Sequence, residues 1–141
     1  MSIPVEDRAL RDALVQMSFE VMGRLTQLAA EEGMSLSQLR LLGVLRDRQP
    51  RMADLARGLG LDRSSVTGLI DRAHRRGLVQ RIAEEGDGRV VRVALTEEGR
   101  RYAERMTTRM SELLTDMVAP LPTATKISLR EGLETALIPR F

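Results

Sequence analysis

The sequence predicts a mainly α-helical fold with one β-hairpin, an α+β arrangement in which a compact middle segment lies between long terminal helices. Two observations predict it. Apolar residues recur at intervals of three and four over most of the 141 residues, which is the helical period. Between positions 79 and 95 the period changes to two, which indicates two strands around a polar turn.

Composition excludes several classes of protein. Apolar residues make up 43% of the chain and charged residues 30%, an ordinary globular balance. No apolar run approaches the roughly 18–20 residues that span a bilayer, so we expect a soluble, cytoplasmic protein with no membrane partner. Cysteine is absent and His74 is the one histidine, so we expect no disulfide, no metal site and no cofactor. Three aromatic residues are too few for the base-stacking surfaces of single-strand binders.

The first helix is expected from Pro4, which suits a first helical turn, to about Gly33, which is typical of a helix end. A chain this small cannot easily cover so long an apolar stripe by itself, so we expect a symmetric partner chain to cover it. The stripe consists of Leu10, Leu14, Met17, Val21, Leu25 and Leu28.

Three shorter helices are expected next, over about 36–46, 52–58 and 63–76. A Ser35 to Gln38 capping box opens the first of them. Asp62 can cap the third helix. The inward face of that helix is expected to be Val66, Leu69, Ile70 and Ala73.

Ala56, Gly60 and Val66 have the spacing of a helix-turn-helix core. That motif needs a small residue where its helices touch, glycine where the turn takes a positive φ, and a branched apolar residue facing inward from the second helix. The triple alone also fits a chance helical hairpin. The residues around it favour the helix-turn-helix.

The outward face of the 63–76 helix is rich in short hydroxyl side chains and arginines. Such a face suits the major groove, where amino-terminal residues of a helix contact base edges and flanking arginines neutralise phosphates. The alternative is an ordinary solvated face, and for Asp71 we prefer that alternative, as an arginine partner. The candidate DNA-contacting residues are Arg63, Ser64, Ser65, Thr67, Gly68, Arg72 and Arg75.

The hairpin is expected to pair residues 79–83 with 90–95 around a polar tip at 84–88. Arg89 follows the tip directly, and an arginine at such a place can enter the minor groove. Asp87 is placed to orient that guanidinium by a charge-assisted hydrogen bond. The alternative is an isolated surface ion pair, which contributes little.

Two helices complete the chain. Thr96 can cap a helix that runs to Val118. Tyr102, early in that helix, lies where a ligand pocket could be. Pro120 and Pro122 then precede a helix of about 124–137. That last helix carries Ile127, Leu129, Leu133, Ala136 and Leu137.

Charge is unevenly distributed along the chain. Residues 35–96 hold twelve arginines against seven acids, a net charge of +5, whereas the flanks hold ten basic residues against thirteen acids, a net charge of −3. A basic middle between mildly acidic ends suggests that the middle meets a polyanion. Scattered surface charge is the alternative.

From about Ser35 to Gly99 the chain resembles the MarR family of winged helix-turn-helix transcription regulators. The resemblance rests on four stretches of sequence. They are Asp54-Leu55-Ala56 with Leu59-Gly60, then Ser64-Ser65-Val66-Thr67 with Leu69-Ile70-Asp71-Arg72, then Arg76-Gly77-Leu78-Val79 with Arg81, and finally Asp87-Gly88-Arg89 with Val93, Leu95, Thr96 and Gly99, which is similar to the family's wing signature.

The resemblance implies one MarR-type domain over 1–141, with a winged helix-turn-helix lobe at 34–99 and a helical dimerisation lobe made of 4–33 and 100–141. It implies a homodimer that binds double-stranded DNA at a pseudo-palindromic operator, usually as a repressor, in the cytoplasm of a bacterium or archaeon and on its nucleoid. Asp87 and Arg89 take the family's wing role. A small phenolic or aromatic effector is a further expectation, with its binding residues unknown.

Three departures from the family pattern leave the operator sequence open. Gly68 stands where relatives often have a larger residue, Ala73 and His74 replace a commoner leucine-acid pair, and Arg51 takes a capping position usual for Ser or Thr. The alternative function is a winged-helix module that grips a protein rather than DNA, which calls for an apolar recognition face. No nucleophile-base pair, phosphate loop or metal cluster indicates an enzyme.

Overall fold

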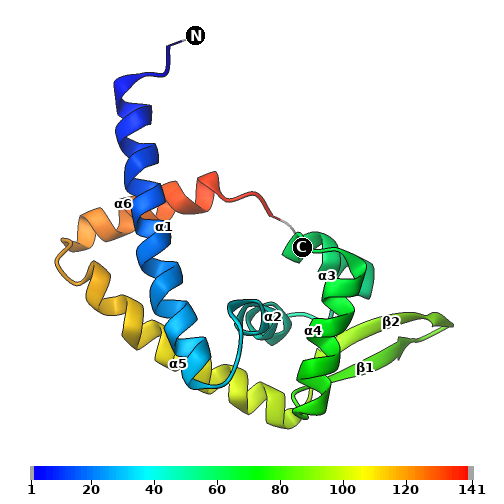
Figure 1. The fold of residues 1–141 in the computed structure, drawn as a ribbon. Coiled ribbons are helices and arrows are strands. Elements are labelled where there is room, and N and C mark those ends of the chain that lie inside the picture. The colour runs from blue at the N-terminus through cyan, green and yellow to red at the C-terminus, as the bar shows by residue number, and fades with distance from the viewer. Residues whose placement is uncertain (1, 140–141) are drawn as a thin grey trace. The chain divides into compact units, whose positions relative to one another are not determined.

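The computed structural model describes residues 2–139, and its helices follow the predicted ones to within two residues at each end (Figure 1). The chain forms two compact units, residues 1–36 and residues 37–141. Whether the terminal helices together make a dimerisation lobe stays a prediction. The helices are α1 (Val5–Glu31), α2 (Leu36–Arg46), α3 (Met52–Leu59), α4 (Arg63–Arg75), α5 (Glu97–Val118) and α6 (Thr123–Ala136).

The first unit is essentially α1 and the turn after it. Pro4 stands at the amino end, and the turn closes at Gly33, whose φ of +66° suits glycine, as expected of a helix terminator. Leu28 and Ala29 near the carboxyl end are buried, whereas the amino-terminal two thirds of the helix is exposed. Phe19 is 69% exposed. Other large apolar side chains exposed on α1 are Val5, Leu10, Leu14, Val15, Met17 and Met22.

The core of the second unit lies among α2, α3, α4 and the hairpin. The predicted inward face of α4 is confirmed, because all four of its residues are buried. Two side chains of α2 bind backbone carbonyls of the helix-turn-helix: Gln38 Nε2 donates to Leu69 O at 3.2 Å, and Arg40 donates to Leu59 O and Gly58 O at 3.1 and 3.2 Å. The most deeply buried side chains are Leu41, Leu42, Leu55, Val66, Ile70, Val79 and Val93.

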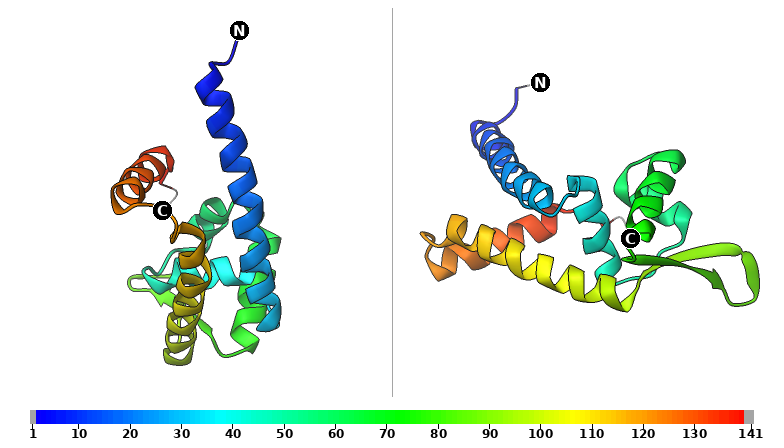
Figure 2. Two further views of the ribbon diagram at one scale, coloured as in Figure 1. Left: turned by 90° about the vertical axis from the view of Figure 1, so that its left-hand side faces the viewer. Right: turned by 60° about the horizontal axis from the view of Figure 1, so that its bottom comes forward.

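The hairpin consists of β1 (Val79–Glu84) and β2 (Asp87–Leu95), and it projects away from the helices of its unit (Figure 2). The predicted five-residue tip at 84–88 is wrong, because Glu84 pairs with Asp87 and only two residues connect the strands. Gly86 makes this tight turn possible, since its φ is +86°. The register then shifts, so that Ala83 pairs with Val91 and residues 88–90 bulge out of β2.

The start of α5 is fitted closely to the end of α4. Thr96 Oγ1 accepts a hydrogen bond from Gly99 N at 2.9 Å, which is the predicted cap, and donates one to Gly77 O at 2.6 Å. The backbone amide of Thr96 also donates to Leu78 O at 3.0 Å. A β-carbon on Gly99 would lie 1.8 Å from that same carbonyl oxygen. Threonine and glycine at these two positions therefore let α5 begin directly against Leu78.

No helix among the described residues is both long and apolar enough to cross a membrane.

Candidate nucleic-acid interface

The turn of the helix-turn-helix forms as its three core residues predict. Gly60 takes a φ of +67° after α3, and the following amide, of Leu61, donates to Ala56 O at 3.0 Å. This pairing satisfies a carbonyl that the helix end leaves free. Val66 is 1% exposed and packs α4 inward. Gly60 and Val66 thus take the positive φ and the burial that the helix-turn-helix motif requires.

The amino end of α4 is capped by Asp62. Its Oδ1 accepts a hydrogen bond from Ser65 N at 2.7 Å and another from Ser64 Oγ, also at 2.7 Å. These hydrogen bonds, that of the Ser65 amide first, hold the pKa of Asp62 below its ordinary value of 3.8. The cap consumes the hydroxyl hydrogen of Ser64, which leaves the lone pairs of that hydroxyl available to an outside donor.

Replacement of Asp62 by alanine is expected to lower the free energy of unfolding at pH 7, whereas replacement by asparagine, also a good cap, is expected to preserve most of it. Because the pKa is lower in the folded protein, the carboxylate contributes stability above pH 3.8 that is lost as the pH falls through the folded value. Urea unfolding at pH 7 and pH 3 checks this. The asparagine variant losing less stability than wild type between the two pH values agrees; equal losses contradict it.

The outward face of α4 is available to a partner. Of the predicted DNA-contacting residues on this helix, Gly68 is half-buried and all the others are exposed. Thr67 Oγ1 donates to Arg63 O at 2.9 Å, so it too presents lone pairs. A β-carbon on Gly68 would lie 3.5 Å from Arg72 Nη1, which shows that this guanidinium lies over the glycine. The predicted DNA-contacting residues Arg63, Ser64, Ser65, Thr67, Gly68, Arg72 and Arg75 therefore share one face, though contact with DNA stays a prediction.

Asp71 is the partner of an arginine, as predicted. Arg81 Nη2 of β1 donates to Asp71 Oδ1 at 2.6 Å. The pair neutralises the acid on this face of α4 and connects α4 to the hairpin.

The wing, by which we mean the hairpin Val79–Leu95, carries Arg89 in the middle of its bulge, where the side chain is exposed. The expected bond between the Asp87 carboxylate and the Arg89 guanidinium is not formed. Asp87 Oδ1 accepts instead from the backbone amide of Arg89 at 3.0 Å, because an aspartate reaches the amide two residues ahead more easily than a distant guanidinium. Among residues 2–139, no hydrogen bond or ion pair holds the Arg89 guanidinium.

A cluster that the sequence did not predict lies where the end of β1 meets the middle of β2. Glu84 accepts hydrogen bonds from Arg51 Nη2 at 2.9 Å and from Arg92 Nη2 at 2.7 Å. These two guanidinium groups, Arg51 first, lower the pKa of Glu84. The one available signal was Arg51 itself, because an arginine at a capping position suggests a partner elsewhere. It makes no side-chain cap for α3.

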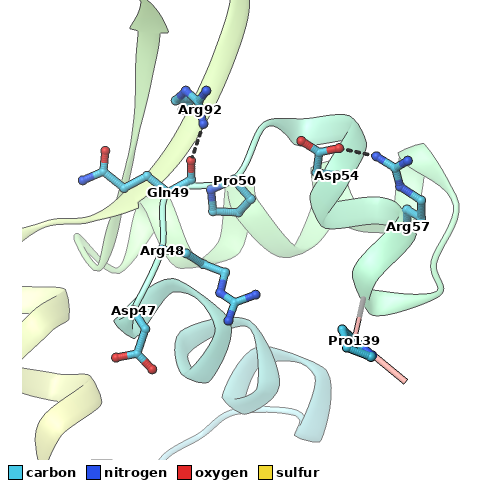
Figure 3. A pocket seen from close by; sticks show the side chains of 8 residues that line it. All are labelled: Asp47, Arg48, Gln49, Pro50, Asp54, Arg57, Arg92 and Pro139. Carbon is cyan, nitrogen blue, oxygen red and sulfur yellow. Dashed lines mark hydrogen bonds and ion pairs between the residues drawn. The ribbon is translucent and has the colours of Figure 1, made fainter. Parts of the chain in front are cut away.

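An open hollow of about 880 Å³ lies beside this cluster, between the α2–α3 connection, α3 and β2 (Figure 3). Arg57 pairs with Asp54 inside it, and Arg92 Nη1 donates to Gln49 O at 2.9 Å. Charges of both signs in a wide opening are typical of a polar surface, whereas small-molecule sites are mostly apolar and enclosed. The residues that line the hollow are Asp47, Arg48, Gln49, Pro50, Asp54, Arg57, Arg92 and Pro139.

Tyr102 lies among cations at the start of α5. The guanidinium carbon of Arg105 is 5.0 Å from the centre of its ring and that of Arg76 is 5.7 Å away, within the range of cation–π attraction. Arg76 Nη2 also donates to the Tyr102 hydroxyl at 3.5 Å. Tyr102 therefore connects the end of α4 to α5. His74, two residues before Arg76, is exposed.

The chain is similar to known regulators in both sequence and fold. Residues 32–90 match the model of the MarR family. The uncharacterized HTH-type transcriptional regulator YsmB of Bacillus subtilis is 43% identical over 54 residues, which are 38% of this chain and 37% of that protein. The match thus spans well under half of that relative.

Two solved structures share the fold over nearly the whole chain. A MarR-family transcriptional regulator from Rhodococcus sp. RHA1 has a TM-score of 0.79 at 23% identity, and the match covers 96% of each chain. CouR from Rhodococcus jostii RHA1, bound to p-coumaroyl-CoA, has a TM-score of 0.74 at 24% identity, with 92% of this chain and 91% of CouR covered.

These similarities agree with the geometry of α3, α4 and the wing. Helices and hairpin follow in the order of a winged helix-turn-helix, and the sequence match falls on the segment that forms it. The segment that forms the winged helix-turn-helix is thus similar in sequence to the MarR family of transcriptional regulators, and the chain shares its fold with solved members of that family.

Proposed function

We propose that the protein is a homodimeric, sequence-specific regulator that binds double-stranded DNA at a pseudo-palindromic operator, usually to repress transcription. The observation that carries the proposal is that the exposed arginine- and hydroxyl-rich face of α4 and the exposed Arg89 of the wing belong to the same compact unit. A helix in the major groove and an arginine in the neighbouring minor groove use such a combination.

The face of α4 favours DNA over a protein partner. Its exposed side chains are charged or hydroxylated, whereas the apolar residues of α4 are buried. Protein interfaces are depleted of charge at their centre. We accordingly propose that the protein acts on the nucleoid, in the cytoplasm of a bacterium or archaeon.

Selection of bound sites from random duplex DNA tests the proposal. We expect a recovered inverted repeat of roughly two helical turns, since two copies of α4 would read two half-sites. Replacement of Ser65 or Thr67 by alanine should change the preferred base at one position of each half-site, because such residues would face base edges. Failure to retain any duplex, together with co-purification of a protein partner, would favour the interaction module instead.

We propose that a second copy of the chain covers the exposed apolar side of α6. No residue of this helix is buried; Leu129 and Leu133 follow one another at an interval of four, and Leu137 comes directly after the helix. Leu133 is 43% exposed. A two-fold partner would cover such residues and would also supply the second half-site reader.

Replacement of Leu133 by glutamate is expected to weaken self-association by at least about a hundredfold, because an unpaired charge would be buried in the interface. Glutamate at Ser128, on the polar side of the same helix, adds the same charge and is expected to leave the dimer intact. Sedimentation velocity over a concentration series measures both. If the Leu133 variant associates as tightly as the Ser128 variant, α6 does not form the interface.

A small-molecule effector is the last part of the proposal. The support is that CouR, which has the same fold, was solved with p-coumaroyl-CoA. We therefore propose that a phenolic compound or its thioester releases the protein from DNA. Titration of p-coumaroyl-CoA into the preformed complex tests this class of ligand; unchanged DNA affinity at saturating ligand excludes that compound.

A further inference from the structure

One carboxylate joins three parts of the winged helix. Glu84, at the end of β1, binds Arg51 and Arg92, which stand directly before α3 and in the middle of β2. The Glu84 side chain is only 20% exposed, against 50% and 37% for the two arginines. It is thus the most enclosed member of the cluster, with a cation on either side.

The backbone repeats the same connection. Arg51 and Arg92 form an isolated antiparallel bridge, and Val93 N donates to Pro50 O at 3.0 Å. Arg92 Nη1 donates to Gln49 O as well. The middle of β2 is therefore attached to the segment that leads into the helix-turn-helix, and Glu84, beside the turn of the hairpin, neutralises the two guanidinium groups that this attachment brings together.

Glu84 also stands at the point where the register of the hairpin shifts. Ala83 pairs with Val91 and Glu84 with Asp87, so the bulge that carries Arg89 begins opposite Glu84. A displacement of Glu84 would therefore move the bulge as well as the contact with Arg51. Its neighbour Glu85, by contrast, is exposed in the turn, and no described residue forms an ion pair with it.

We propose that Glu84 is a positioning residue for DNA binding. It holds the wing and its Arg89 in the orientation in which the wing and α4 contact the same duplex. This inference rests on the proposed function. It predicts a change in DNA affinity opposite to the electrostatic one, because removal of an acid near a polyanion should by itself strengthen binding. If Glu84 positions the wing, its removal weakens binding.

The test compares Glu84→Ala with Glu85→Ala, which removes the same charge one residue away. Dissociation constants are measured on the selected operator at fixed salt, with urea unfolding as the check on folding. We expect Glu85→Ala to bind as tightly as wild type or more tightly and Glu84→Ala to bind about tenfold more weakly. Glu84→Gln, which keeps an acceptor oxygen for one arginine, should have a dissociation constant between those of wild type and Glu84→Ala. If the alanine variant folds poorly, the glutamine variant is compared with wild type alone and should bind more weakly.

A double-mutant cycle with Arg89→Ala separates positioning from general destabilisation. If Glu84 acts through Arg89, Glu84→Ala should cost less than about twofold in the Arg89→Ala background. Equal costs in both backgrounds, or tighter binding by Glu84→Ala, would overturn the inference while leaving the proposed function intact. Failure of the wild-type protein to bind any duplex would overturn the proposed function, and this inference with it.

Discussion

Replacement of Gly99 by alanine is expected to destabilise the fold by about 3 kcal/mol, at the upper end of what overpacking costs. The added methyl group would lie 1.8 Å from the carbonyl oxygen of Leu78 and 2.8 Å from its carbonyl carbon, both backbone atoms. Neither can move aside like a flexible side chain. The start of α5 would have to shift, and with it the hydrogen bonds of Thr96 to Gly77 and Gly99.

Gly43 supplies the matched control for this prediction. It lies within α2, and nothing is within 4 Å of the position that its β-carbon would occupy. Gly43→Ala should therefore stabilise the protein, by up to about 1 kcal/mol, through helix propensity alone. Urea unfolding followed by circular dichroism gives both free energies. A Gly99→Ala variant as stable as wild type would show that α5 does not begin against Leu78.

Replacement of Arg89 by alanine is expected to weaken DNA binding by about tenfold to a hundredfold at low salt, for specific and non-specific duplexes alike. The guanidinium is exposed at the wing bulge and, among the described residues, has no protein partner to exchange for DNA. It therefore gives up no intramolecular ion pair when it binds. The loss should shrink as the salt concentration rises.

The control for Arg89 is Arg101→Ala, which removes one exposed positive charge from α5, where Arg101 Nη1 lies 3.1 Å from Glu97 Oε1. If the wing meets DNA, only Arg89→Ala weakens binding strongly, as a gel-shift titration would show. Equal losses for the two variants would mean that overall charge, rather than the wing, sets the affinity.

The sequence was sufficient to predict the helices because each one carries its own local signals. Asp62 and Thr96 form the caps that their residue types indicate, and Gly33 and Gly60 take the positive φ angles expected at helix ends. The buried face of α4 follows from its apolar spacing in the same way. These features depend on residues within one or two turns of each other.

The sequence was insufficient where the outcome depends on pairing between strands. The tight turn at Gly86 starts β2 three residues earlier than alternation suggests, and the resulting shift opposes Glu84 to Asp87. The Arg51–Glu84–Arg92 cluster follows from that register and from the bridge at Arg51, which joins residues about 40 positions apart. Asp87 likewise binds the backbone amide of Arg89 and not the guanidinium that the sequence predicts, because short side chains prefer nearby backbone amides.

The most direct test of the account is the salt dependence of binding to the selected operator. If paired helices and wings lie along the DNA backbone, the logarithm of the association constant should fall linearly with the logarithm of salt concentration, with a slope of about −0.9 for each phosphate neutralised. We predict a slope of about −4 or steeper for the wild-type protein, and one shallower by about 1 for each Arg89 lost. Binding that does not change between low and high salt would contradict the account.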